Sequence, residues 1–291
     1  MMSMGDVKKL RDMTQAGVMD AMKALKECNN DLEKAAQWLR EKGIAKAAKK
    51  AGAIVTEGVA KAIAIADYGC VVEINCQTDF VANGDQFKEL VKGIVNAISQ
   101  NKPKSLEELL STKYNENETI QDACTTLTAK TGEKIAIRRI GVLEKQDSQA
   151  FATYEHFNGK VAVILQMSKA DEKVGRTIAM HIAAMNPKFL NRNAVDPAWI
   201  ANETEVLKKQ TLAEGKPADR VDMIVKGRIN KSLADVCLED QASITDPSKK
   251  IKDIASAAGI ELINFIRYEV GEGVEKKKED FAAEVASQMN V

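Results

Sequence analysis

Apolar residues recur at helical spacing in three short runs within residues 1–42. In the third run, Asn30 followed by Glu33 forms a capping-box-like start, and Gly43 is a natural helix end. The pattern predicts a small three-helix domain over 1–42 and a linker over 43–54. A bundle of this size has little room for a pocket and is typical of interaction modules.

The pattern changes from helical spacing to strict alternation in residues 55–145. Residues 59–66 alternate with period two, a short turn follows at 67–69, and residues 70–76 are a second predicted strand, so we expect a β-hairpin. An amphipathic helix follows, with Asn83 as its expected N-cap, and an apolar run over 134–143 predicts a closing strand. We expect these elements to form one core subdomain.

The same order of elements recurs further along the chain. The second copy comprises the predicted strands 151–156 and 160–167, the helix 171–186 and the strand 260–270. We expect it to form a second core subdomain from residues 146–190 and 234–270. Two related copies of hairpin, helix and closing strand predict an α+β fold with antiparallel sheets.

Residues 191–233 interrupt the second copy with two helical runs. Asp196 and Pro197 form a good N-cap and first helical position, so we predict an inserted, coiled-coil-like helical hairpin. Its second helix carries an apolar stripe formed by Val221, Ile224, Val225, Ile229 and Leu233. Two interpretations remain open: the stripe mediates a homodimer, or the first helix of the hairpin covers it.

The tail, residues 271–291, is highly charged at first, and Phe281 then begins a short amphipathic pattern. We expect a small C-terminal helical module there. A terminal helix with so little core of its own must dock on another surface to be stable.

The composition excludes several classes of protein. The 42 basic and 42 acidic residues cancel, whereas a nucleic-acid-binding protein usually has a basic excess. No apolar run reaches the length of about 20 residues that a membrane span needs. The five cysteines form no CxxC pair, and the first residues lack the features of a signal peptide. We therefore expect a cytoplasmic protein that contacts neither membrane nor nucleic acid directly.

The sequence contains few residues in patterns typical of a catalytic site. The two histidines, His156 beside a predicted turn and His181 on an apolar helix, lie far apart and form no metal-binding motif. We expect His156 to be exposed and His181 to be a partly buried helix residue. No phosphate-binding loop is present, and Cys76 has no histidine nearby in sequence to activate it. The sequence thus predicts no enzyme and no cofactor, and an enzyme with a nucleophilic Cys76 is a competing hypothesis.

The segment that joins the second strand to the following helix, residues 75–83, carries an acid and a ring in succession. The ordinary interpretation is that Thr78 or Asp79 caps a turn and that Phe80 enters the core. The following helix, however, has its own expected cap in Asn83 and its own apolar face, so Asp79 and Phe80 are surplus. A bulky ring beside a carboxylate on a loop tip would make a good wedge.

Several motifs in the chain resemble the elongation factor Ts family of bacterial translation factors. They are Asn75-Cys-Gln-Thr-Asp-Phe-Val81, Met180-His-Ile-Ala-Ala184 and Phe265-Ile-Arg-Tyr-Glu-Val-Gly-Glu-Gly-Val274, with residues 7–14 and 280–285 at the two ends. The resemblance spans essentially the whole chain. It implies a ubiquitin-associated-like N-terminal domain and a guanine-nucleotide exchange factor for elongation factor Tu.

The resemblance also implies which residues act. The loop residues Thr78, Asp79, Phe80 and Val81 would displace Mg²⁺ from the partner GTPase. Further partner contacts are implied for Arg11, Val18, Met19, His156 and Ile244.

The sequence departs from the family pattern at Thr131, where an apolar residue is expected, and in residues 241–245, which lack an expected Pro-Phe pair. A passive adaptor, which tethers partners through the N-terminal domain without acting on a nucleotide, is the alternative to an exchange factor.

Overall fold

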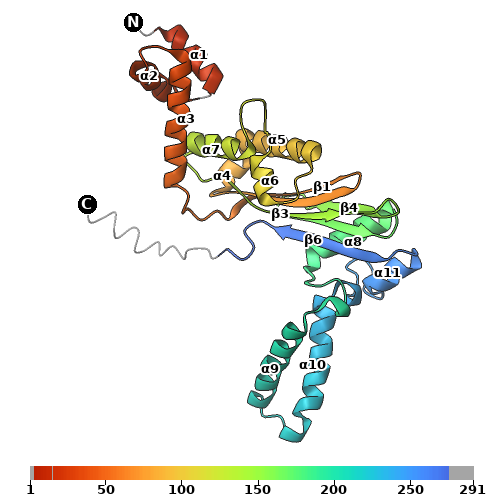
Figure 1. Ribbon diagram of the computed structural model, residues 1–291. Coiled ribbons are helices and arrows are strands. Elements are labelled where there is room, and N and C mark those ends of the chain that lie inside the picture. The colour runs from red at the N-terminus through yellow and green to blue at the C-terminus, as the bar shows by residue number, and fades with distance from the viewer. Residues whose placement is uncertain (1–2, 15, 275–291) are drawn as a thin grey trace. The chain divides into compact units, whose positions relative to one another are not determined.

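The computed structural model describes residues 3–14 and 16–274 (Figure 1). Contacts group the chain into two compact units. Of the described residues, the first unit contains those up to 59, 73–138 and 270–274, and the second contains 60–72 and 139–269. This grouping cuts through the strands of the first sheet, so the two core subdomains expected from the sequence remain a prediction.

The three predicted N-terminal helices are present, as α1 (Met4–Thr14), α2 (Val18–Glu27) and α3 (Leu32–Lys49). Their small core consists of Val7, Leu10, Ala21, Ala24, Leu25 and Ala35. The start of α3 differs by one residue from the prediction, because the Asp31 side chain, not that of Asn30, accepts a hydrogen bond from the Lys34 backbone N–H at 3.0 Å. Asn30 instead adopts a positive φ of 65°.

The prediction that Gly43 ends the third helix is wrong, since α3 continues to Lys49. The reason is tertiary packing against α7 (Ile120–Thr131). A Cβ atom at Gly43 would lie 3.3 Å from the Cβ of Ala129, so glycine permits close approach of the two helices. The predicted linker is correspondingly shorter and begins after Lys49.

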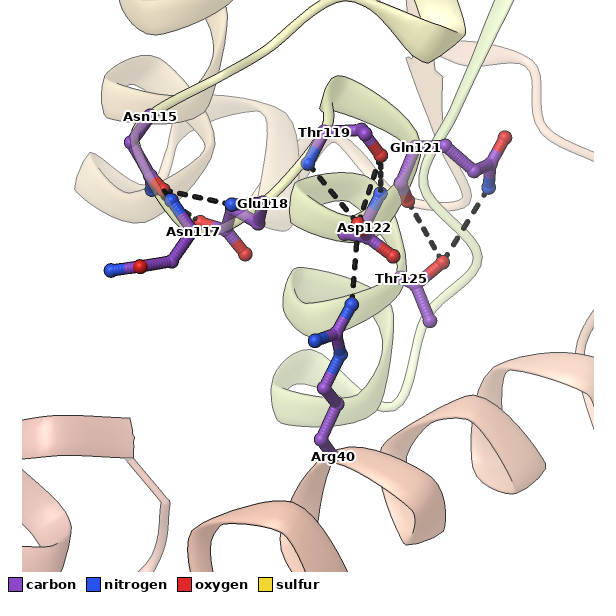
Figure 2. A network of polar contacts seen from close by, with 8 residues as sticks. All are labelled: Arg40, Asn115, Asn117, Glu118, Thr119, Gln121, Asp122 and Thr125. Atoms are coloured by element: carbon purple, nitrogen blue, oxygen red, sulfur yellow. Dashed lines mark hydrogen bonds and ion pairs between the residues drawn. The ribbon is translucent and has the colours of Figure 1, made fainter. Parts of the chain in front are cut away.

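An ion pair joins the same two helices (Figure 2). Arg40 of α3 lies 3.4 Å from the carboxylate of Asp122. Asp122 is also the N3 residue of a capping box, in which it accepts from the Thr119 N–H while the Thr119 hydroxyl accepts from the Asp122 N–H. The hydrogen bonds from Thr119 and the ion pair with Arg40 lower the pKa of Asp122.

Within the described residues, the strands form two three-stranded sheets, each in sequential order. The first contains β1 (Glu57–Ile65), β2 (Tyr68–Cys76) and β3 (Ala136–Glu144). The second is antiparallel and contains β4 (Ala150–Glu155), β5 (Val161–Met167) and β6 (Leu262–Glu269). In the second sheet, Ile164 pairs with Thr153 on one side and Ile266 on the other. The predicted repeat of hairpin and closing strand, and the α+β class, are confirmed.

Helices cover these sheets in both units. The first unit contains α4 (Asp79–Asn83), α5 (Asp85–Asn101), α6 (Leu106–Ser111) and α7, and the second contains α8 (Glu172–Met185) and α11 (Ile251–Ala257). Gly175 allows α8 to lie close to its sheet, because a Cβ there would come within 2.7 Å of Ala152 and Met167. The core between α8 and its sheet includes Val163 and Leu165 of β5 and Ile178 and Ile182 of α8.

The inserted helical hairpin consists of α9 (Pro197–Ala213) and α10 (Val221–Val236), which run side by side (Figure 1). Asp196 caps α9 as predicted, since its carboxylate accepts from the Ala198 N–H at 2.8 Å. Val221, Val225 and Leu233 of the apolar stripe are buried within the chain. This burial favours the interpretation that the two helices cover each other, and a homodimer through the hairpin stays a prediction.

A buried carboxylate anchors the segment that follows β6. Glu73 of β2 is 0% exposed and accepts from Arg138 at 3.2 Å and from the Gly271 N–H at 2.8 Å. Arg138 also donates to the Glu272 carbonyl at 2.6 Å. Gly271 has a φ of 77°, and a Cβ there would lie 2.7 Å from the Thr56 carbonyl oxygen, so glycine is required.

The remaining structural expectations concern the tail, membranes and metals. The helix predicted to begin at Phe281 lies outside the described residues. Across 3–14 and 16–274, no helix combines the length and apolarity of a membrane span, and no three His, Cys, Asp or Glu side chains come together as a metal site would require.

Candidate partner-binding site

The loop after β2 is a short helix, α4, and Thr78 is its N-cap. The Thr78 hydroxyl accepts a hydrogen bond from the Val81 N–H at 3.3 Å. The prediction that Asn83 caps the next helix is therefore wrong. Asn83 ends α4 and donates from Nδ2 to the Asp79 carbonyl at 2.9 Å, whereas Gly84 begins α5 without a side-chain cap. Thr78 lies directly after β2, so its hydroxyl caps the helical turn that begins there.

Helix α4 turns its apolar ring toward solvent. Ala82 is buried and Val81 is half-buried, but Phe80 is 86% exposed. The ordinary interpretation, in which Phe80 enters the core, is wrong for this structure. Asp79 is also exposed, and within the described part of the chain its carboxylate makes no hydrogen bond or ion pair. The helix thus presents a phenyl ring beside a carboxylate that is available to a partner.

Glu133 braces the start of α4 from the turn that follows α7. One carboxylate oxygen accepts from the Thr78 N–H at 3.1 Å, and the other accepts from the Thr78 hydroxyl at 2.8 Å. Beside it, Gln77 Oε1 accepts from the Lys134 N–H at 2.8 Å. Glu133 cannot be identified from the sequence, because a contact across 55 residues of chain leaves no local pattern.

Cys76 is buried at the end of β2, and its thiol donates to the Thr78 carbonyl at 3.1 Å. A nucleophilic cysteine needs access for its substrate and a neighbouring base. The thiol of Cys76 has no exposed surface, so its contact serves to hold the strand against the start of α4. The structure gives no support to the hypothesis that Cys76 is a nucleophile.

The N-terminal residues that the resemblance implies lie on the surface of the three-helix domain. Met19, at the start of α2, is 79% exposed, and Val18 and Arg11 are exposed as well. Arg11 Nε donates to the Ala16 carbonyl at 3.3 Å, which ties the end of α1 to the residues just before α2. Exposed apolar side chains beside a fixed cation are typical of a protein-binding surface.

His156, at the turn between β4 and β5, is half-buried and not fully exposed as predicted. Its Nδ1 lies 3.3 Å from the Tyr154 hydroxyl, and its ring centroid lies 4.5 Å from that of Phe157. Phe157 itself is 93% exposed. The hairpin pattern of the sequence marks Phe157 only as a turn residue, although a phenylalanine in such a turn is a sign of an interaction surface.

His181 of α8 is fully buried, which goes further than the partial burial expected from the sequence. Its Nε2 lies 2.9 Å from Gln241 Oε1, and its Nδ1 accepts from the Ile244 N–H at 3.3 Å. Burial lowers the pKa of His181, and the hydrogen bond to Gln241 acts in the opposite direction. Ile244, the last implied contact residue, is 38% exposed.

The lowered pKa of His181 predicts a loss of stability in mild acid. The unfolded chain binds a proton near pH 6.5, whereas the folded chain does so at lower pH. The stabilisation is therefore complete above pH 6.5 and is lost as the pH falls toward the folded pKa, by up to about 1.4 kcal/mol per pH unit.

We expect urea midpoints at pH 7.5 and 5.5 to differ more for the wild type than for His181→Asn. Both proteins contain His156, so the comparison isolates the effect of position 181. Equal pH dependence of the two proteins would contradict the prediction.

Comparison with known proteins agrees with the features described above. The family model described as elongation factor TS matches residues 77–272, more than half of the chain. The elongation factor Ts of Limosilactobacillus reuteri (strain DSM 20016) is 45% identical over 284 residues, which cover 98% of this chain and 97% of that protein. The elongation factor Ts of Lacticaseibacillus casei (strain BL23) is 43% identical over 283 residues, 97% of each. The chain belongs to the elongation factor Ts family.

Proposed function

We propose that this protein is a guanine-nucleotide exchange factor that binds elongation factor Tu carrying GDP and promotes GDP release, in support of translation elongation. Membership of the elongation factor Ts family supports the role in exchange. The observation that carries the mechanism is the exposed Phe80 on a short helix braced by Glu133.

The proposed mechanism acts on Mg²⁺ in the partner. That ion bridges phosphate oxygens of the bound nucleotide and neutralises part of their charge. Insertion of the Phe80 ring beside the nucleotide site, with Asp79 next to it, would disturb the Mg²⁺ ligands. Loss of the ion leaves the phosphates repelling nearby acidic groups, so GDP binds more weakly.

Thermodynamic linkage between the binding of GDP and the binding of the factor accounts for exchange of this kind. If the factor weakens the binding of GDP, GDP weakens the binding of the factor by the same ratio. No covalent bond is made or broken in nucleotide exchange, so the protein needs no catalytic acid or base of its own. Its task is to hold a wedge in a fixed orientation, and Thr78 and Val81 contribute by closing the first turn of α4.

Two further surfaces would supply affinity. Arg11, Val18 and Met19 on the three-helix domain would contact the partner's GTPase domain. His156 and Ile244 would contact another domain of the partner. The exposure of Arg11, Val18, Met19 and Ile244, and the exposed Phe157 beside the half-buried His156, support these assignments.

The release of a fluorescent GDP analogue from purified elongation factor Tu tests the proposal. With millimolar Mg²⁺ present, we expect the full chain to accelerate release strongly, and chelation of Mg²⁺ to reduce the difference between release with and without the factor. A folded protein that binds the partner without accelerating release would instead be an adaptor.

The hydrogen bonds between Glu133 and Thr78 predict a graded effect on the release rate. Glu133→Ala removes both acceptors for Thr78 and should lower the maximal release rate by about tenfold, which corresponds to the loss of hydrogen bonds to a charged group. Glu133→Gln keeps one acceptor oxygen and should lower the rate less. A maximal rate in Glu133→Ala equal to that of the wild type would show that α4 is positioned without the brace.

A further inference from the structure

The hydrogen bonds of His181 fix its tautomer. A backbone N–H can only donate, so Nδ1, which meets the Ile244 N–H at 3.3 Å, must carry a lone pair. The orientation of the Gln241 amide is also fixed, because its Nε2 donates to the Asp235 carbonyl at 2.6 Å. Gln241 Oε1 therefore faces His181, and Nε2 of the ring must carry the proton. The imidazole ring of His181 is therefore neutral, and each of its two nitrogens makes a hydrogen bond.

The loop that contains Gln241 and Ile244 is also ordered by hydrogen bonds of its own backbone. The Ile251 N–H donates to the Gln241 carbonyl at 3.0 Å, and the Ser243 N–H donates to the Lys249 carbonyl at 2.9 Å. These two bonds close the base of the loop. Gln241 and Ser243 are buried, so the base belongs to the core of its unit.

Ile244 is the point at which the loop leaves the core. Its backbone N–H turns inward to His181, while 38% of the residue remains exposed. The side chain is a branched hydrocarbon at the surface, and its direction depends on the backbone at this residue. The bond to Nδ1 is the contact that fixes that backbone from a different element, α8.

We propose that His181 is a positioning residue for partner binding: as a neutral acceptor at Nδ1, it orients Ile244 so that this side chain contacts the partner. This inference rests on the proposed function, because the partner is taken to be elongation factor Tu. A histidine that only filled space in the core would not need the acceptor at Nδ1. The two roles therefore predict different behaviour for isosteric variants.

Two substitutions separate the ring nitrogens. In His181→Asn, Oδ1 takes the position of Nδ1 and remains an acceptor for the Ile244 N–H. In His181→Gln, Nε2 takes the position of the ring Nε2–H and remains a donor to Gln241, but the acceptor at Nδ1 is lost. Both variants remove the ring, so they share the loss of packing.

The dependence of the GDP release rate on factor concentration provides the readout. For His181→Gln we expect the half-saturating concentration to rise about fivefold, in line with the loss of one hydrogen bond, with an unchanged maximal rate. For His181→Asn we expect a value within about twofold of wild type. In an Ile244→Ala background, His181→Gln should have almost no further effect, because the two residues act as one unit.

Equal effects of the two variants, or additive effects of His181→Gln and Ile244→Ala, would overturn the proposal. The tautomer of the wild-type chain can be read by nitrogen NMR of its two histidines, with His156→Ala for assignment. A proton on Nδ1 of His181 would also overturn it, even if a variant failed to fold. If the wild type binds elongation factor Tu but does not accelerate GDP release, the exchange function fails, while the same variants still test positioning through the dissociation constant.

Discussion

Replacement of Phe80 by alanine is expected to remove most of the acceleration of GDP release without unfolding the protein. The ring is 86% exposed, so its removal leaves no cavity in the isolated chain. In the complex, a buried aromatic anchor of this kind contributes about 2 kcal/mol or more, which corresponds to roughly a 30-fold change. We expect this loss in the maximal release rate, measured at saturating factor, with the circular dichroism spectrum unchanged.

Phe157 provides a matched control for this experiment. It is also a highly exposed phenylalanine, but it lies at the β4–β5 turn and not on α4. Phe157→Ala should raise the half-saturating concentration and leave the maximal rate unchanged, because it removes affinity only. If both alanine variants lowered the maximal rate alike, Phe80 would have no special role as a wedge. If Phe80→Ala kept the full rate, the wedge mechanism would be wrong.

Most secondary structure followed from the spacing of apolar residues, because burial of one face imposes its period on the sequence. The hairpin strands β4 and β5 and the cap Asp196 are examples in which local pattern and structure agree. The failures at Asn30 and Asn83 are local, because Asp31 caps α3 and Asn83 ends the short helix α4, whereas the failure at Gly43 has a tertiary cause. Gly43 resembles a helix end locally, yet contact with Ala129 of α7 stabilises a continuous helix.

The residues of the candidate site also fall into two groups, those that the sequence pattern identifies and those that it does not. Phe80 could be identified because the following helix already had a complete apolar face, which left the ring without a place in the core. Glu133 and Gln241 could not be identified from spacing. Each reaches its partner, Thr78 or His181, across more than 50 residues of chain, and a glutamate or glutamine that makes such a contact looks like any surface residue in the sequence.

The largest effect on stability is expected at Arg138, because it compensates a buried charge. Glu73 is fully buried, and Arg138 meets both of its carboxylate oxygens at 3.2 Å. Removal of one partner of a buried ion pair weakens the compensation of the charge that remains and costs about 3 kcal/mol or more. Arg138→Met should therefore lower the free energy of unfolding by about this amount in urea at pH 7.

A second substitution shows whether the charge is the cause. In the double variant Glu73→Gln with Arg138→Met, the side chain at position 73 is neutral, and its Oε1 can still accept from Asn75 Nδ2 and from the Gly271 N–H. We expect the double variant to recover more than half of the stability lost in Arg138→Met, because replacing both partners of a buried pair is far less damaging than removing one. If the double variant were as unstable as the single one, the loss would come from the packing of the arginine stem and its bond to the Glu272 carbonyl, and the buried charge would have little part in it.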